Sequence, residues 1–158
     1  MRRSERQITS IEDILRILDT CKVCRIAMVD GNKPYMVPMS YGYEYSEGLL
    51  TLYFHCAPAG RKIDLLKTNP FVCFEMDHGF ELIEADIACN YSNTYQSIIG
   101  TGTVEFLEGY EQKSHALDIL MKTQTGREGF SYSEKAVEQV TAFKVASADF
   151  TAKSRPKK

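Results

Sequence analysis

The sequence predicts a mainly β protein: an antiparallel barrel of six to seven strands, with helices packed outside it. Two observations predict this fold. Short runs rich in β-branched and aromatic residues are separated by tight turns such as Asp30-Gly31-Asn32, which join antiparallel neighbours. Helical periodicity is confined to a few segments that do not alternate with the strands, which argues against a parallel βαβ sheet.

The N-terminal part of the chain is predicted to form one helix and three strands. In residues 11–19 apolar side chains recur at helical spacing, and Ser10 with Asp13 resembles a capping box. Strands are expected at 22–29, 35–45 and 49–56, joined as a meander. Pro38 has no N–H to donate, so its strand should form a sheet edge or carry a bulge at that residue.

The rest of the chain is predicted to alternate helices and longer strands. After a loop at 57–60, a short helix is expected at 61–67, stopped by Asn69-Pro70. Gly100 and Gly102 predict a bend or a close backbone approach, and His78-Gly79 predicts a turn. Further strands are expected at 71–77, 81–88, 95–106 and 140–151, and further helices at 110–121 and from about residue 133.

Composition restricts the class of protein. A length of 158 residues fits a single domain, 1–158, with flexible tails at about 1–8 and 152–158. A net charge of -2 gives no general attraction to nucleic acid or to a membrane surface, and no apolar run predicts a membrane span or a signal peptide. Five scattered cysteines fit reduced thiols, so a cytoplasmic location is expected.

Several motifs favour ordinary structural roles. Cys21-x-x-Cys24 could form half of a zinc site or a redox pair, but no second such motif completes it, so two buried thiols are expected and no metal site is assigned. His115 is expected at the surface. The acidic residues Glu81, Glu84 and Asp86 are expected on a solvated strand face, and most of the tyrosines at 41, 43, 45 and 53 in a cross-strand ladder.

The segment from Tyr53 to Lys62 carries the clearest chemical signal. A strand delivers His55 to its C-terminal end, a loop containing Gly60 follows, and Arg61 and Lys62 open a short helix. Because a helix N-terminus already has a positive dipole end, cations are unfavourable there unless an anion lies between. The pattern therefore points to a phosphate, with a pair of solvated surface cations as the alternative.

The same segment resembles a known family. Gly60-Arg61-Lys62-Ile63-Asp64-Leu65-Leu66, followed by Asn69-Pro70, is similar to the phosphate-binding segment of the pyridoxamine 5'-phosphate oxidase-like, FMN-binding split-barrel proteins, in particular the Nim-type nitroimidazole-resistance branch. Three further segments, 24–27, 34–43 and 95–102, resemble that branch in the same order. The likeness covers roughly residues 3–153.

The resemblance implies a homodimer that binds FMN in a groove shared by two subunits. By position, Arg61 and Lys62 would bind the phosphate, and His55 would face the groove as a hydrogen-bond partner or an axial haem ligand. The remaining implied cofactor-binding residues are Val37, Pro38, Met39 and Ser40, along the isoalloxazine ring, and Tyr95, Gln96 and Ser97, near the flavin or its phosphate.

The function implied is an FMN-dependent oxidoreductase that transfers a hydride from NAD(P)H to a small acceptor such as a nitro-aromatic. No catalytic residue is assigned beyond His55 as a candidate. Pyridoxamine-phosphate oxidation itself is not expected, because counterparts of the oxidase's further basic residues are missing. The alternative is a flavin- or haem-binding carrier or sensor without turnover.

Overall fold

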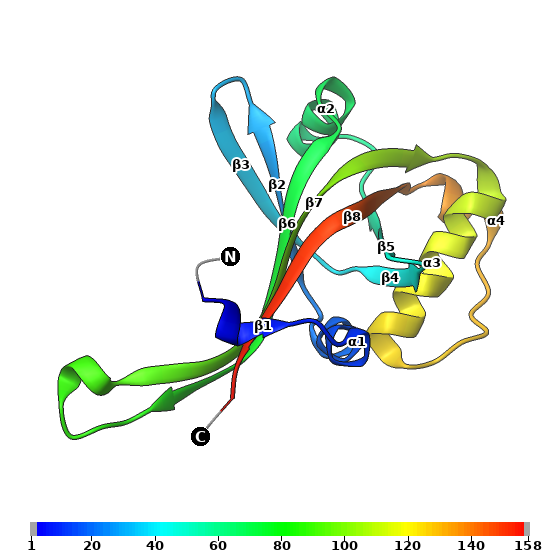
Figure 1. Cartoon of the computed structure of the whole chain (residues 1–158). Coiled ribbons are helices and arrows are strands. Elements are labelled where there is room, and N and C mark those ends of the chain that lie inside the picture. The colour runs from blue at the N-terminus through cyan, green and yellow to red at the C-terminus, as the bar shows by residue number, and fades with distance from the viewer. Residues whose placement is uncertain (1–2, 157–158) are drawn as a thin grey trace.

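The computed structural model describes residues 3–156 and shows one antiparallel sheet that curls into an open-sided barrel (Figure 1). The strand order is β3-β2-β6-β7-β8-β5-β4, and β1 pairs with β8. The mainly β, split-barrel fold expected from the sequence is confirmed, with eight strands in place of six or seven. They are β1 (Gln7–Ile8), β2 (Cys24–Asp30), β3 (Lys33–Met39), β4 (Gly42–Ser46), β5 (Leu49–Cys56), β6 (Phe71–Ile83), β7 (Ser92–Leu107) and β8 (Thr141–Arg155).

The helices lie at the ends and on one side of the sheet. They are α1 (Ile11–Thr20), α2 (Arg61–Thr68), α3 (Gly109–Thr125) and α4 (Glu134–Glu138), with 3-10 turns η1 (Ser4–Arg6) and η2 (Ala88–Asn90). The predicted cap of α1 is present, because the Ser10 hydroxyl accepts a hydrogen bond from the N–H of Asp13 at 3.4 Å. None of the helices in residues 3–156 is long and apolar enough to cross a bilayer.

The core fills the space between the curled sheet, α1 and α2. Phe54 and Phe143 stack there with ring centroids 5.2 Å apart, and Phe74 is fully buried. The close approach expected at Gly100 and Gly102 is found: a Cβ at Gly100 would lie 2.7 Å from the Phe150 Cβ, and one at Gly102 would lie 2.6 Å from the Ala146 carbonyl oxygen.

The single strand predicted over 35–45 is wrong, and so is the meander. The segment forms β3 and β4, which lie at opposite edges of the sheet. The chain turns through the core between them, where Tyr41 is buried and donates its hydroxyl proton to the Leu18 carbonyl at 2.7 Å. Beside it, a Cβ at Gly42 would lie 2.6 Å from the Ile119 carbonyl carbon. The edge position expected for the strand of Pro38 is confirmed.

Residues 78–95 form a two-stranded ribbon, here called the arm, that projects away from the barrel (Figure 1). The sequence predicted two strands separated by a turn at His78-Gly79. Instead, β6 continues to Ile83 through a register shift between His78 and Glu81, with Gly79 at a φ of 72°. A β-bulge therefore replaces the predicted turn, and Gly supplies the left-handed conformation that the bulge needs.

Part of each predicted tail is also a strand. Gln7 pairs with Lys153 and Ile8 with Ala152, so β1 covers the edge of β8, which runs to Arg155. Each residue of β1 lies about 145 residues along the chain from its partner in β8, so no local pattern indicates the pairing. Residues 1–2 and 157–158 of the predicted tails lie outside the described part of the chain.

Candidate functional site

The corner where β5 passes into α2 holds the residues with the strongest chemical signal. Gly60 has a φ of 139°, and a Cβ built there would have no atom within 4 Å, so the backbone borders open space. Its carbonyl accepts the N–H groups of Ile63 at 2.8 Å and Asp64 at 3.2 Å. The N–H groups of Arg61 and Lys62 begin the helix and have no intrahelical acceptor. The corner therefore offers backbone donors to an anion.

Arg61 ties this corner to the turn between β2 and β3. Its Nε donates to Asp30 Oδ2 at 3.0 Å, and its Nη2 donates to the same oxygen. The guanidinium carbon lies 4.5 Å from the centre of the Tyr35 ring, a cation–π contact. The Asp30 hydrogen bonds raise the pKa of Arg61. In this conformation the guanidinium is exposed and forms an ion pair with Asp30.

Lys62 differs from its neighbour, because it has no carboxylate partner among residues 3–156. Its Nζ lies 3.4 Å from Met39 Sδ and also contacts the Cys56 thiol. Burial raises the pKa of Cys56, and the positive charge of Lys62 opposes that shift. A half-buried ammonium whose neighbours are sulfur atoms is poorly compensated. The side chain is therefore available to an anionic ligand.

A cavity of about 210 Å³ adjoins this ammonium. It is bordered by β3, the end of β5 and the start of α2, with Tyr35, Val37, Cys56, Gly60, Arg61 and Lys62 among its lining residues. His55 precedes the lining residue Cys56 at the end of β5, but it is exposed on the opposite face of the strand and does not line the cavity. Partial desolvation, and then the charge of Lys62, lower the pKa of His55. Its imidazole is therefore neutral at neutral pH.

The four predicted residues of β3 and its end divide between two faces. Val37 borders the cavity and Met39 is buried beside Lys62, whereas Pro38 and Ser40 are exposed. β3 ends the strand order, so one of its two backbone edges has no neighbouring strand. Tyr35 and Val37 of this strand border the same cavity as Lys62.

Tyr95, Gln96 and Ser97 lie elsewhere in the chain, at the base of the arm. Ser97 pairs with Asp77 across β6, and the Tyr95 hydroxyl accepts a hydrogen bond from Arg6 at 3.4 Å. From Asp77 to Phe71, which follows α2, β6 spans six residues, or about 20 Å. Val37, Met39, Arg61 and Lys62 meet at one corner, whereas Tyr95, Gln96 and Ser97 lie on β7, which β2 and β6 separate from β3.

The cysteines of Cys21-x-x-Cys24 are both buried, as expected for structural thiols. Burial is the main cause that raises the pKa of Cys21 to about 12, and it raises the pKa of Cys24 further. Neither sulfur is therefore a reactive thiolate at neutral pH.

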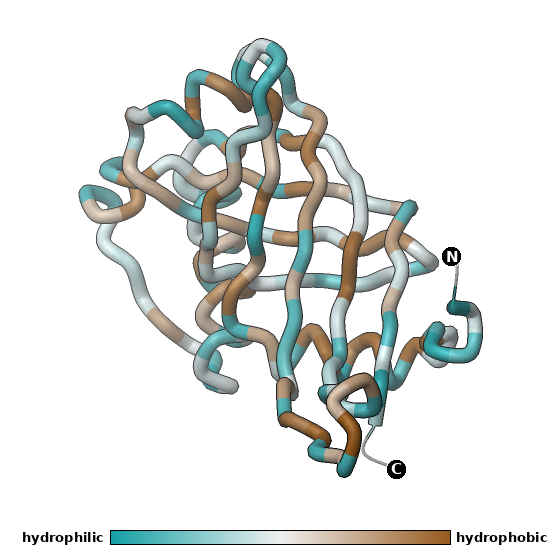
Figure 2. The backbone as a smooth tube through the Cα atoms, turned by 90° about the vertical axis from the view of Figure 1, so that its left-hand side faces the viewer, coloured by the Kyte–Doolittle hydropathy of each residue, from teal (hydrophilic) through white to brown (hydrophobic). Residues whose placement is uncertain are grey.

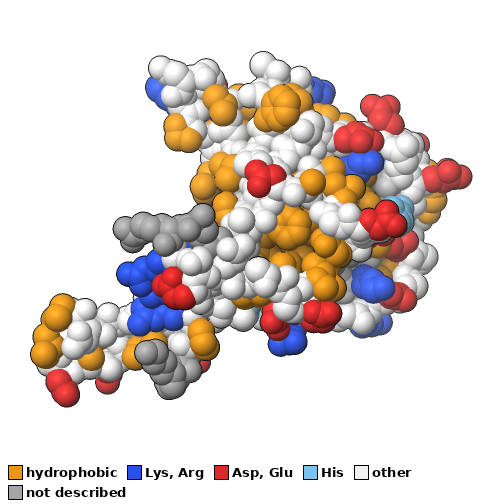
Figure 3. Space-filling view, viewed as in Figure 1, with side chains coloured by type: hydrophobic (Ala, Val, Ile, Leu, Met, Phe, Trp, Pro, Cys, Tyr) orange, Lys and Arg blue, Asp and Glu red, His pale blue; other side chains and the backbone are white. Residues whose placement is uncertain are grey.

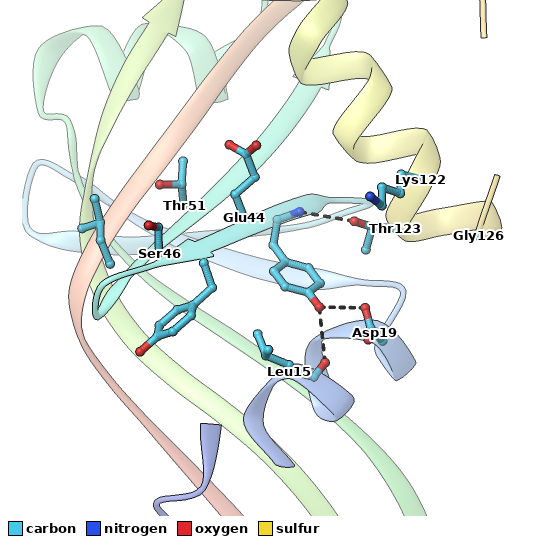
Figure 4. A pocket seen from close by; sticks show the side chains of 11 residues that line it. Leu15, Asp19, Glu44, Ser46, Thr51, Lys122, Thr123 and Gly126 are labelled. Atoms are coloured by element: carbon cyan, nitrogen blue, oxygen red, sulfur yellow. Dashed lines mark hydrogen bonds between the residues drawn. The ribbon is translucent and has the colours of Figure 1, made fainter. Parts of the chain in front are cut away.

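Sequence reasoning missed a cavity of about 660 Å³ that is bordered by β4, α1 and α3 (Figure 4). Tyr43 lines it and makes two hydrogen bonds there. Its hydroxyl donates to Asp19 Oδ1 at 2.7 Å, and its backbone N–H donates to Thr123 Oγ1 at 3.3 Å. Burial raises the pKa of this tyrosine. Because the cavity forms where α1, β4, β5 and α3 come together from distant parts of the chain, no local motif in the sequence marks it. Its lining residues are Leu15, Asp19, Tyr43, Glu44, Tyr45, Ser46, Leu49, Thr51, Lys122, Thr123 and Gly126.

Comparison with family models matches residues 10–154 to pyridoxamine 5'-phosphate oxidase. The chain belongs to the pyridoxamine 5'-phosphate oxidase family. A solved structure from Bacteroides thetaiotaomicron, named as a candidate 5-nitroimidazole antibiotic resistance protein, is 38% identical, with a TM-score of 0.80, over 94% of this chain and 86% of that one. The family and the nitroimidazole-resistance branch suggested by the sequence motifs are thereby confirmed.

More distant structures share the fold. The flavocytochrome Anf3 of Azotobacter vinelandii is 19% identical, with a TM-score of 0.80, over 99% of this chain and 72% of that one. An FAD- and haem-binding protein of Mycobacterium smegmatis is 19% identical, with a TM-score of 0.81, over 96% and 74%. No curated protein matches the chain.

Proposed function

We propose that this protein is an FMN-dependent oxidoreductase that transfers a hydride from NAD(P)H to a small acceptor such as a nitro-aromatic. The observation that carries the proposal is the half-buried Lys62 ammonium, which has no carboxylate partner among residues 3–156 and stands at the start of α2. A phosphate at this corner would compensate the charge and accept hydrogen bonds from the first N–H groups of the helix.

The residues present fit the phosphate end of FMN. Gly60 leaves open space where any other residue would place a Cβ, and its φ of 139° disfavours a side chain there. Lys62 supplies a point charge, while Arg61 supplies a planar fork once it leaves Asp30. The corner thus has one cation, Lys62, that can bind the phosphate directly, and a second, Arg61, that can bind it after leaving Asp30.

The free edge of β3 fits the ring end. Its exposed backbone groups beside Pro38 and Ser40 can bond the polar pyrimidine edge of an isoalloxazine, and Val37 borders the same cavity. Bound flavin supplies hydride transfer, which no side chain of the protein provides. The chain's own contribution is to hold the phosphate at Lys62 and Arg61 and to orient the ring against β3.

A homodimer is part of the proposal. Tyr95, Gln96 and Ser97 lie at the base of the arm, and Ser97 pairs with Asp77, which is six residues or about 20 Å along β6 from Phe71. In the proposed dimer, the second copy would supply these three residues to the cofactor held at the Lys62 corner of the first. The family likeness and this separation together support a groove between two subunits.

The phosphate site is tested by substituting both cations. Arg61→Ala combined with Lys62→Ala should weaken FMN binding at least tenfold in a fluorescence titration, because each charge-assisted hydrogen bond contributes roughly 1.5–3 kcal/mol. Lys67→Ala is the matched control, since Lys67 stands in the last turn of the same helix. Equal affinities in the double variant and the wild type would refute the site.

Turnover is tested separately by mixing the FMN-loaded protein with NADH or NADPH and following flavin absorbance. Bleaching, followed by recovery on adding a nitro-aromatic compound, is the expected result. The alternative is a carrier or sensor, favoured by the exposed His55, an imidazole that could ligate haem, and by two fold relatives that are a flavocytochrome and an FAD- and haem-binding protein. A Soret band in the purified protein without reductase activity would support that alternative.

A further inference from the structure

The backbone of β4 has an edge that no strand covers. β4 ends the strand order, so only β5 pairs with it. In an antiparallel pair, residues that bond the neighbouring strand alternate with residues whose backbone groups point away from it. Because the N–H of Tyr43 donates to Thr123 Oγ1 on α3, Tyr43 is of the second kind, and so is Tyr45 two residues later. The N–H and C=O groups of these two residues therefore point to the open edge.

Helix α3 covers the beginning of this edge and ends before the rest. Gln124 Nε2 donates to the carbonyl of Tyr41 at 2.8 Å, and Thr123 Oγ1 accepts the N–H of Tyr43 at 3.3 Å. The helix ends with the next residue. No side chain or loop among residues 3–156 bonds the carbonyl of Tyr43 or the N–H and carbonyl of Tyr45. These backbone groups are left to water or to a partner outside the chain.

The cavity of about 660 Å³ runs along this uncovered edge (Figure 4). Four consecutive residues of β4, from Tyr43 to Ser46, line it. Successive side chains of a strand point to opposite faces, so a cavity bordered by four residues in a row follows the edge of the strand. Leu15 of α1 borders it on the face of Tyr43, and Thr51 borders it on the face of Glu44, its cross-strand partner.

The walls of the cavity also offer apolar contacts. Leu15, Tyr43 and Tyr45 pack against the core with part of each side chain exposed, and Leu49 is 45% exposed. In Figure 3, apolar side chains gather between β8 and α1, in front of β4. A chain that enters the cavity in extended form would reach the free backbone groups and would place alternate side chains on both faces. This is the geometry by which a peptide adds a strand to a sheet.

The charged side chains that line the cavity are mainly acidic. They are Asp19, Glu44 and Lys122, and an ion pair with Glu128 offsets the charge of Lys122. The Asp19 carboxylate has a tyrosine hydroxyl as its partner, but no Lys or Arg among residues 3–156 forms an ion pair with it. Lys22 beside it donates to backbone carbonyls instead. A segment that brings a Lys or Arg side chain is therefore favoured over an acidic one.

We propose that the free edge of β4 binds an extended segment of a partner protein, one that carries a Lys or Arg side chain and adds a strand to the sheet. Its backbone would bond the free groups of Tyr43 and Tyr45, and its cation would lie beside Asp19. The site is independent of the proposed cofactor, because β3 and β4 are the two ends of the strand order. The edge of β3 belongs to the half of the sheet that faces the viewer in Figure 2, and the β4 cavity lies behind that half.

The first test uses a short labelled peptide of alternating valine and lysine. Fluorescence anisotropy should show saturable binding to the wild-type protein, and the same peptide with glutamate in place of lysine should bind at least about fivefold more weakly. Alternate N–H groups of a strand point to opposite edges, so N-methylation of the odd or of the even positions blocks one edge each. One pattern should abolish binding and the other should preserve it. No saturable binding at about 1 mM peptide, or the same loss with both patterns, overturns the proposal.

Two substitutions of Tyr45 separate the backbone from the ring. Tyr45→Pro removes the edge N–H but none of the hydrogen bonds between β4 and β5, whereas Tyr45→Ala keeps that N–H. Both lose the edge-on contact with the Phe150 ring, whose centroid lies 6.4 Å from that of Tyr45, so the loss of packing is shared. Peptide affinity should be at least about threefold lower in Tyr45→Pro than in Tyr45→Ala. Equal affinities would place the peptide away from this edge and overturn the proposal.

The charge preference is tested at Asp19. Asp19→Asn keeps an acceptor for the Tyr43 hydroxyl but removes the charge, so it should weaken binding of the lysine peptide about threefold and leave the glutamate peptide no weaker. Asp64→Asn, at an exposed position on α2, is the matched control. Unchanged binding of the lysine peptide by Asp19→Asn would refute the choice of a cationic segment. Complete displacement of the peptide by an equal concentration of butylamine would assign the cavity to a small organic cation and overturn the peptide site.

Discussion

The two halves of the sheet are covered differently, although β6, β7 and β8 run between them. In the half that contains β4 and β5, helix α3 adds a second layer: Leu52 faces the barrel core, Tyr53 faces α3, and both are buried. In the half that contains β2, β3 and the arm, only one face is buried: Phe74 is fully covered, whereas Phe71 is 68% exposed.

This difference assigns stability of the fold to one half of the sheet and binding of the proposed cofactor and second copy to the other. The two-layered half holds the packed aromatic residues, and the one-layered half holds the exposed apolar groups, the free edge of β3 and the Lys62 corner. Because a sheet needs its apolar face covered, the one-layered half is where a second copy and a cofactor have surface to occupy. The predictions below test that division.

The largest expected effect compares two phenylalanines. Phe143→Ala in the two-layered half should lower the free energy of unfolding by about 3–5 kcal/mol, because it leaves a cavity beside Phe54 and Phe106. Phe80→Ala on the arm should change it by no more than about 0.5 kcal/mol in dilute, monomeric protein. Urea denaturation measures both, and equal losses would contradict the division.

A smaller loss is expected where β4 meets α3. Gly42→Ala should destabilise the fold by about 1–3 kcal/mol, because the new Cβ would lie 2.6 Å from the backbone carbonyl carbon of Ile119. Ser40→Ala, two residues earlier and exposed, is the control and should be neutral. If Gly42→Ala left the free energy of unfolding unchanged in the same assay, β4 and α3 would be able to move apart at little cost.

The one-layered half allows a change in the opposite direction. Asp30→Asn should tighten FMN binding, by no more than about fivefold, because it frees the Arg61 guanidinium from an exposed ion pair and such pairs contribute little. Asp118→Asn on α3 serves as the control. Fluorescence titration measures both variants, and weaker binding in Asp30→Asn would mean that the ion pair positions α2 for the cofactor.

The smallest effect concerns His55. Its folded-state pKa is lowered below the ordinary 6.5, first by desolvation and then by Lys62. As pH falls below 6.5, His55 therefore takes up a proton in the unfolded chain at a higher pH than it does in the folded chain. Stability contributed by the neutral imidazole is present above that pH and is lost as pH falls through the folded-state value. His55→Gln should remove this part of the pH dependence in denaturation curves at pH 5–8, and an unchanged profile would contradict it.

The sequence was informative where the signal is local. The Ser10 cap, the turn at residues 30–32, and the loop and helix that position Arg61 and Lys62 all follow from neighbouring residues, and all are found. The sequence treated the two cations alike, but long-range contacts distinguish them. Arg61 is bound to Asp30, some thirty residues earlier, whereas Lys62 has no carboxylate partner among residues 3–156. The predicted roles of the site residues in cofactor binding stay predictions.

By itself, the sequence determined the mainly β fold, the start of α2 with its two cations and the family motifs, because periodicity, turn residues and helix caps act over a few residues. Tertiary structure alone decided that residues 35–45 divide between two sheet edges, that β6 continues through a bulge into the arm, and that β1 covers β8. These features depend on which strands pair and on what lies above a backbone position such as Gly42. Such choices are made by packing between residues distant in the chain, so no local pattern specifies them.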